Sequence, residues 1–385
     1  MQTYGRFPLA LVRGEGCWVW DEEGKKYLDF ISGLGVNSLG HCHPAVVGAV
    51  KEQVEKILHC SNLYYTKPQA ELAEILIKNS CFDRVFFCNS GAEANEAAIK
   101  LARKYSHLKY GEDRKEIIST LNSFHGRTMA TITATGQTKY QAGFNPLLPG
   151  FKYVAYGDFE ALKEAVSSQT CAVLIEPVQG EGGINTAEKD YWQALREFCS
   201  QNDILLIFDE VQCGLARTGK LFAYEALGVE PDIITLAKAL GGGLPIGAMM
   251  ARESAASAFR PGDHASTFGG NPVAAAAAVA VMKTFLTENI PGRAEKLGNY
   301  FQAKLRDLQF KYPQIKEVRG LGLMIGVEVA EKGPEIVKSC LEKGLLINCT
   351  AEKVLRFLPP LIIGEAEVDQ AVNILADAFG ENFKN

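Results

Sequence analysis

The chain has 385 residues, a net charge of −5, 47% hydrophobic residues and 22% charged residues. This composition excludes a disordered chain, and an acidic chain without a basic run is a poor partner for nucleic acid or an anionic membrane. Ten cysteines without a CxxC pair favour free thiols in a reducing compartment. The N-terminus lacks the pattern of a signal peptide, so we expect a cytoplasmic protein.

From the N-terminus, the first predicted element is a hairpin, because Trp18 and Trp20 precede an acidic turn that contains glycine. Short apolar runs then alternate with helical patterns. Strands are expected at residues 84–88, 116–121, 172–176, 204–209, 233–237 and 247–251. Helices are expected at residues 92–105, 159–168 and 191–202. Apolar strands separated by helices predict a mostly parallel sheet covered on both faces, which binds ligands beyond the carboxyl ends of its strands.

The last hundred residues have a different pattern, that of a smaller α+β domain on which the N-terminal hairpin packs. A long charged helix extends to about residue 312, and a final helix has its apolar face at residues 368–379. Between them, a glycine-rich strand is expected at 320–329, a helix at 334–343, and strands at 345–348 and 354–357. The predicted organisation is a large cofactor-binding domain, residues 46–286, and a small domain made from residues 1–45 and 287–385.

Residues 89–93, Asn-Ser-Gly-Ala-Glu, directly follow a predicted strand. Ser90 and Glu93 have the spacing of a capping box, which begins a helix. Gly91 and Ala92 have small side chains and offer backbone N–H groups at the positive end of the helix dipole, which suits a phosphate. Taken alone, the motif fits an ordinary capped helix better than a binding site.

Two charged side chains lie at the ends of consecutive apolar strands. Asp209 ends the first strand, and Lys238 ends the second, before a Gly-Gly-Gly-Leu-Pro turn. A partly desolvated lysine has a lowered pKa and can form a Schiff base. A lysine in that linkage, an aspartate on a pyridinium nitrogen and a helix N-terminus on a phosphate together describe pyridoxal 5′-phosphate.

The chain resembles the class III aminotransferases over nearly its whole length. The longest matching motif extends from Leu206 to Pro245 and contains both Asp209 and Lys238. The shorter motifs are GHCHP at 40–44, SGAEA at 90–94, FHGRT at 124–128, EPVQGEGG at 176–183, STFGGNP at 266–272 and RFLPPL at 356–361. The opening YGRFP and VRGEG is most similar to the acetylornithine aminotransferase branch. The resemblance implies an α/β fold, the type I pyridoxal-phosphate-dependent transferase fold, with a large mostly parallel sheet domain and a smaller α+β domain.

The same resemblance implies roles around the cofactor ring. Lys238 would hold pyridoxal 5′-phosphate as a Schiff base and then move a proton between substrate and cofactor. Asp209 would keep the ring nitrogen protonated, and Gln212 would hydrogen-bond the ring hydroxyl. Phe124 would stack on one ring face and Val211 would pack on the other.

At the phosphate, the resemblance implies a site shared between two subunits of a homodimer. Ser90, Gly91 and Ala92 would come from one subunit and Thr267 from its partner. Ser266 lies in the same polar turn and is assigned to the substrate site. A catalytic dimer with shared active sites is therefore expected.

Three further residues are assigned to amino-acid substrates. Arg127 would bind a substrate carboxylate, Arg356 would bind the α-carboxylate of glutamate, and Glu181 would neutralise Arg356 when the amine donor is not glutamate. Arg356 lies in an apolar strand, which demands a buried partner. The implied reaction moves the δ-amino group of N2-acetyl-L-ornithine to 2-oxoglutarate. Ornithine, 4-aminobutyrate and succinyldiaminopimelate aminotransferases remain alternatives, as does a regulatory protein that keeps only the cofactor pocket.

Two other motifs suggest rival functions, and neither is complete. His41-Cys42-His43 is not expected to hold a metal, because neighbouring side chains on extended backbone point to opposite faces. Residues 214–220 match GxxxxGK, but Leu221 stands where a P-loop requires Ser or Thr. The roles of His41, His43 and His125 are left open.

Overall fold

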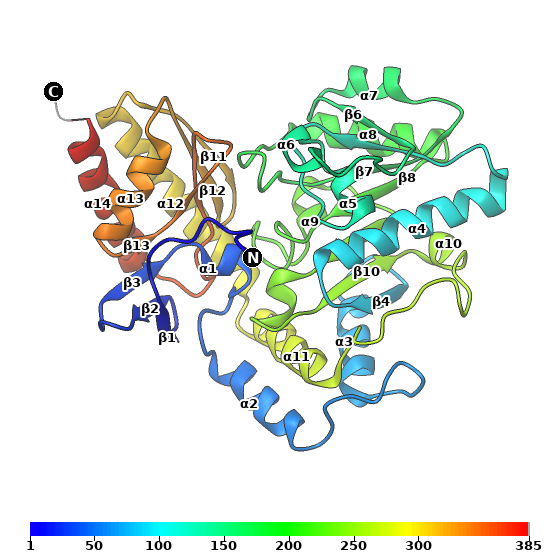
Figure 1. Cartoon of the computed structure of the whole chain (residues 1–385), viewed down its shortest axis with the longest axis horizontal. Helices are drawn as coiled ribbons and strands as arrows, with labels where there is room; N and C mark the ends of the chain where they lie inside the picture. The colour runs from blue at the N-terminus through cyan, green and yellow to red at the C-terminus, as the bar shows by residue number, and fades with distance from the viewer. Residues whose placement is uncertain (384–385) are drawn as a thin grey trace.

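A seven-stranded sheet forms the centre of the computed structural model, which describes residues 1–383 (Figure 1). Its order is β4-β10-β9-β8-β7-β5-β6. The bounds are β4 Arg84–Cys88, β5 Glu116–Thr120, β6 Phe151–Val154, β7 Thr170–Ile175, β8 Leu205–Asp209, β9 Ile233–Leu236 and β10 Gly247–Ala251. All neighbours from β9 to β6 run parallel, whereas β10 runs antiparallel to both β4 and β9. The predicted mostly parallel sheet is confirmed.

Alternate residues of the central strands face opposite layers of helices. In β8, Leu205 and Ile207 pack in the same apolar cluster as α4, whereas Leu206 and Phe208 pack in the cluster that contains α3 and α8. Because both faces are covered, these strands are apolar throughout rather than alternating. The helices of this region are α2 Pro44–Val54, α3 Lys67–Lys78, α4 Gly91–Tyr110, α5 Met129–Ala134, α6 Thr138–Gln141, α7 Phe159–Ala165, α8 Lys189–Gln201, α9 Ala223–Leu227, α10 Glu253–Ala256 and α11 Pro272–Thr287.

The sequence did not predict the edge strand β6 or the short helices α5 and α6. β6 has four residues, Phe-Lys-Tyr-Val, of which the first three are half-buried. An edge strand lacks the continuous apolar signal of a central one, and helices of four to six residues are too short to show a period.

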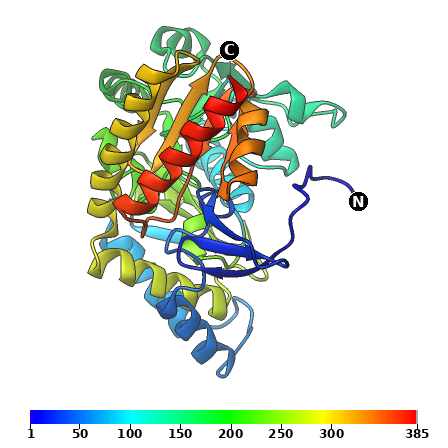
Figure 2. The same cartoon turned by 90° about the vertical axis from the view of Figure 1, so that its left-hand side faces the viewer.

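A second sheet, antiparallel throughout, lies beside the large one in the order β11-β12-β15-β14. Its strands are β11 Ile315–Leu321, β12 Met324–Val329, β14 Asn348–Thr350 and β15 Val354–Phe357. The helices α12 Ile290–Lys311, α13 Gly333–Glu342 and α14 Glu365–Asn382 lie side by side over it (Figure 2). The predicted single strand at 320–329 is wrong, because Gly322, with a φ of 53°, turns the chain between β11 and β12. Glycine tolerates both conformations, so its sequence pattern hides such a turn.

The N-terminal strands join the C-terminal part of the chain, as predicted. β1 Leu11–Glu15, β2 Trp18–Asp21 and β3 Lys26–Asp29 form an antiparallel sheet, and β13 Leu345–Leu346 adds to it parallel to β3. The irregular helix α1 Ser32–Gly35 then leads toward the large sheet. The domain ranges 46–286 and 1–45 with 287–385 stay predictions, and residues 384–385 lie outside the described part.

Within residues 1–383, no single helix is long and apolar enough to cross a membrane, and only the bent pair α11 and α12, at 67°, reaches that length and composition together.

Candidate active site

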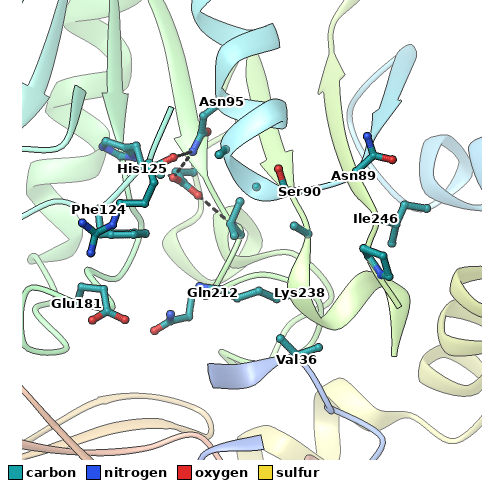
Figure 3. Close-up of a pocket in the computed structure, with 18 of the residues that line it drawn as sticks. Val36, Asn89, Ser90, Asn95, Phe124, His125, Glu181, Gln212, Lys238 and Ile246 are labelled. Atoms are coloured by element: carbon teal, nitrogen blue, oxygen red, sulfur yellow. Dashed lines mark hydrogen bonds and ion pairs between the residues drawn. The ribbon is translucent and has the colours of Figure 1, made fainter. Parts of the chain in front are cut away.

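A cavity of about 470 Å³ lies at the carboxyl edge of the large sheet (Figure 3). Asp209 ends β8, Lys238 follows β9 and Glu176 follows β7, so three adjacent parallel strands deliver them to one place. This is where a parallel sheet is expected to bind its ligand. The other lining residues are Val36, Asn89, Ser90, Gly91, Ala92, Asn95, Phe124, His125, Gly126, Arg127, Glu181, Val211, Gln212, Ala237, Gly243, Leu244, Pro245 and Ile246.

Asp209 is buried at the bottom of the cavity and is held by three nitrogen atoms. Its Oδ2 accepts a hydrogen bond from Asn95 Nδ2 at 2.7 Å and lies 2.7 Å from His125 Nδ1. Its Oδ1 accepts from the backbone N–H of Val211 at 3.0 Å. These contacts fix the orientation of the carboxylate, and a carboxylate in this position can hold a protonated ring nitrogen.

Lys238 opens a short 3-10 turn, Lys238–Gly241, in a strained backbone conformation with a φ of 41°. Left-handed backbone at a non-glycine residue is typical of functional sites. Burial lowers the pKa of its amine, while the carboxylate of Glu181 opposes and the charge of Arg356 adds to this effect. A lysine that loses its proton easily suits covalent attachment to a carbonyl carbon.

The N-terminus of α4 points at the same cavity. Ser90 Oγ accepts from the backbone N–H of Glu93 at 3.2 Å, which is half of the predicted capping box. The other half differs, because Glu93 Oε2 accepts from the backbone N–H of Asn89, at 2.6 Å. A helix leaves its first N–H groups without internal partners, so those of Gly91 and Ala92 are available to an anion.

The N-terminus of α4 is packed so tightly that only small residues fit there. A Cβ placed on Gly91 would lie 2.6 Å from Cγ1 of Val211. A Cβ on Gly126 would lie 2.7 Å from Cβ of Ala92, and Gly126 has a φ of 138°. The backbone of the phosphate-side turn and the side chain of Val211 therefore meet without room for another methyl group.

Arg356 of β15 does not line the cavity; it is buried behind two residues that do, Glu181 and Gln212, and is ion-paired. Its Nη1 donates to Glu181 Oε1 at 2.7 Å, to Gln212 Oε1 at 3.2 Å and to the carbonyl of Gly180 at 3.1 Å. Its Nε donates to Asn348 Oδ1 at 3.2 Å. Burial alone would raise the pKa of Glu181, but the charge and hydrogen bond of Arg356 outweigh it and hold the pKa below the ordinary value.

Arg127 is exposed at the mouth of the cavity and lies on aromatic rings. Its guanidinium carbon is 4.0 Å from the ring centre of Tyr140 and 5.5 Å from that of Phe124. Phe124 and Tyr140 meet edge to face at 5.7 Å. Stacking fixes the plane of the guanidinium and leaves its N–H edge available for a carboxylate.

Glu176 is a site residue to which the sequence reasoning gave no role. Its two oxygens accept from the backbone N–H groups of Phe124, at 2.9 Å, and Gly180, at 3.0 Å. Burial raises its pKa to about 7. Glu176 directly follows a buried strand, as Asp209 ends one, and an acidic residue in that position is the signal in the sequence that could have identified it. Tyr140 and Asn95 were also missed, and of these only Asn95, a polar residue among the alanines of α4, carried a signal in the sequence.

The structure does not bring every predicted residue into the cavity. Ser266 lies just behind it, where its Oγ accepts from Asn89 Nδ2 at 3.2 Å, and Thr267 is exposed on the surface. His41 lies away from the site and pairs with Asp29 Oδ2 at 2.7 Å. Residues 1–383 contain no cluster of three His, Cys, Asp or Glu side chains placed to hold a metal.

Three features of the cavity match three groups of one cofactor. The amine of Lys238 suits an aldehyde, the carboxylate of Asp209 suits a ring nitrogen, and the open end of α4 suits a phosphate. Together with the mostly parallel sheet, they define the class of pyridoxal-phosphate-dependent enzymes. The close fit of Gly91 against Val211 further suits a flat ring and phosphate that approach the backbone closely.

Comparison with known proteins narrows this class to one family. The model of the family "Aminotransferase class-III" matches residues 1–379. The acetylornithine aminotransferase of Caldanaerobacter subterraneus is 57% identical over 99% of this chain and 97% of its own length. Two solved structures are similar: ornithine aminotransferase from Toxoplasma gondii (TM-score 0.96, 37% identity, 99% of this chain and 92% of that one) and acetylornithine aminotransferase from Elizabethkingia anophelis (0.89, 36%, 99% and 96%). The chain belongs to the class III aminotransferases, and its cofactor is pyridoxal 5′-phosphate.

Proposed function

We propose that this enzyme moves the δ-amino group of N2-acetyl-L-ornithine to 2-oxoglutarate, giving N-acetyl-L-glutamate 5-semialdehyde and L-glutamate, a step of arginine biosynthesis. The observation that carries the proposal is the buried Arg356 paired with Glu181 at 2.7 Å. The 57% identity to an acetylornithine aminotransferase supports the choice of amine donor.

The pair of Arg356 and Glu181 suits an enzyme that binds two different substrates in one place. Glutamate has two carboxylates, and Arg356 binds the α-carboxylate once Glu181 has moved away. Acetylornithine brings no carboxylate to that position, and Glu181 then neutralises the buried guanidinium. Arg127, on the other side, takes the α-carboxylate of acetylornithine or the distal carboxylate of glutamate.

Each residue assigned to the cofactor would act on a different group of it. Lys238 Nζ would hold the cofactor and would carry a proton to and from the substrate carbon. Asp209 would hold the proton of the ring nitrogen, and Phe124 and Val211 would enclose the ring. Gln212 Oε1 already accepts from Arg356, so its amide N–H group is left for the ring hydroxyl. When bound, pyridoxal phosphate supplies an electron sink for the carbon that loses its proton.

We further propose a homodimer in which Thr267 reaches the phosphate of the partner subunit. An apolar surface supports this: Leu58, Leu63, Tyr64, Tyr65 and Phe268 are 59%, 85%, 69%, 101% and 60% exposed. Asn62 links the two segments of this surface, residues 58–65 and 266–269, because Asn62 Nδ2 donates to the carbonyl oxygens of Ser266 and Gly269 at 2.9 Å. A surface of this kind on a globular chain marks an interface.

The cysteines support a location in the cytoplasm. All ten are free thiols, which suits a reducing compartment.

The substrate is tested with purified holoenzyme and single amine donors. Each donor is mixed in a stopped-flow spectrometer, and loss of the lysine-bound cofactor absorbance gives the rate of its half-reaction. Acetylornithine and glutamate should both react, with acetylornithine ahead of ornithine, 4-aminobutyrate and succinyldiaminopimelate. Free ornithine is the second candidate, because the ornithine aminotransferase of Toxoplasma gondii has a TM-score of 0.96. A preference for ornithine would overturn the substrate proposal and leave the family intact.

A further inference from the structure

Asp209 is the end of a buried chain of hydrogen bonds that starts at Thr235 of β9. Thr235 Oγ1 donates to Asn95 Oδ1 at 2.7 Å. Asn95 Nδ2 then uses both of its hydrogens, toward Asp209 Oδ2 at 2.7 Å and toward the carbonyl oxygen of His125 at 2.8 Å. All four residues are at most 3% exposed. The three elements β9, α4 and β8 thus meet in one polar network inside an apolar core.

The partners of Asn95 leave its amide only one workable orientation. If the amide were reversed, its oxygen would face the Asp209 carboxylate and the His125 carbonyl, and its N–H group would face the Thr235 hydroxyl. Three acceptor oxygens, those of Asn95, Asp209 and the His125 carbonyl, would then face one another with no hydrogen between them. Thr235 lies outside the lining of the cavity, so its hydroxyl affects the cavity only through Asn95.

Asn95 and the phosphate-side residue Gly91 lie on the same helix, α4. Gly91, whose N–H group suits the phosphate, lies one helical turn before Asn95, which is about 6 Å along the axis. One rigid helix therefore sets the phosphate end of the site and, through Asn95, the carboxylate that meets the ring nitrogen. The distance between the two anchoring points is then independent of loop motion.

We propose that Asn95 and Thr235 are positioning residues for pyridoxal phosphate: Thr235 orients the Asn95 amide, and Asn95 holds the Asp209 carboxylate with Oδ1 turned to the cofactor. Among residues 1–383, Asp209 Oδ1 has a single N–H partner, that of Val211 at 3.0 Å, so one of its lone pairs is open there. His125 binds the same Oδ2 at 2.7 Å, which makes Asn95 the second of two restraints on that oxygen. The proposal rests on the cofactor and not on the identity of the amine donor.

The test compares Thr235→Val, which keeps the shape and removes the hydroxyl, with Thr235→Ser, which keeps the hydroxyl. Two properties are measured: the Kd of the apoenzyme for pyridoxal phosphate, by fluorescence titration, and the pH midpoint of the visible absorbance of the lysine-bound cofactor. An unsatisfied buried acceptor on Asn95 should raise the Kd of Thr235→Val about tenfold. Thr235→Ser should stay within about twofold of the wild type.

The pH midpoint separates positioning from mere packing. A ring-nitrogen proton held by Asp209 places positive charge near the nitrogen that joins Lys238 to the cofactor and lowers the affinity of that nitrogen for a proton. A misplaced Asp209 weakens this effect, so the midpoint of Thr235→Val should rise by about half a pH unit or more. A lower melting temperature with unchanged Kd and midpoint would overturn the proposal. If Thr235→Val does not fold, Thr235→Ala is subjected to the same measurements and criteria.

Discussion

Arg356 and Glu181 form an ion pair at 2.7 Å in which one partner is fixed and the other is accessible: the arginine side chain is 1% exposed and the glutamate side chain 23%. Arg356 has further acceptors in Gly180, Gln212 and Asn348, which hold its guanidinium in place. The carboxylate of Glu181 is thus the member of the pair that can leave when a substrate carboxylate arrives.

Arg356→Ala should therefore damage the two half-reactions unequally. Loss of a buried charge partner costs about 2–5 kcal/mol, which is roughly thirtyfold to several thousandfold, and only glutamate depends on Arg356. The acetylornithine half-reaction should be largely spared, whereas Arg127→Ala should slow both. Stopped-flow absorbance with each donor alone measures the two rates. Equal losses in both halves for Arg356→Ala would contradict the division of roles.

The pKa of Glu181 predicts how this pair responds to acid. In the folded state it lies below the ordinary value of 4.5, so the stabilisation is present above pH 4.5 and is lost as pH falls through the folded pKa. Between about pH 6 and about pH 3.5, the melting temperature of Glu181→Gln should fall less than that of the wild type. Glu188→Gln, at an exposed position outside the site, is the control and should follow the wild type. Parallel curves for Glu181→Gln and the wild type would exclude the linkage.

Gly91→Ala should weaken cofactor binding through a collision with Val211. The new Cβ would lie 2.6 Å from Val211 Cγ1, and the displaced valine would enter the space assigned to the ring. Overpacking of this kind costs about 1–3 kcal/mol, so the Kd for pyridoxal phosphate should rise at least about fivefold. Gly48→Ala, in α2 with no atom within 4 Å of its new Cβ, is the matched control and should bind normally. Normal binding by Gly91→Ala would show that the ring lies elsewhere.

Shared active sites predict complementation between two inactive variants. Lys238→Ala lacks the attachment point, and Thr267→Glu places a negative charge where the partner's phosphate is expected. A mixed dimer would contain one intact site, so subunit exchange should restore about a quarter of wild-type activity. Sedimentation equilibrium should show dimers for both variants. No recovery after confirmed exchange, or an active monomer, would refute the shared site.

Much of the site was predictable because its chemistry lies at the ends of local elements. Asp209 and Lys238 end apolar strands, and Ser90 with Glu93 marks the start of α4, so short stretches of sequence located them. The resemblance to class III aminotransferases then supplied their roles. Local patterns also predicted the parallel sheet, but they failed at the turn of Gly322, where glycine hides a reversal of the chain.

What the sequence determined by itself is therefore the set of strand and helix ends and the burial of a charge, Arg356, that required a partner. Only the tertiary structure decided the contacts: Thr235 reaches Asn95 across 140 residues, and Asn95 reaches Asp209 across 114. No periodicity links such distant positions, because their distance in space depends on how β9, α4 and β8 pack. The same reason explains why Glu176 and Asn95 stayed without a role until the side chains around Asp209 were seen together.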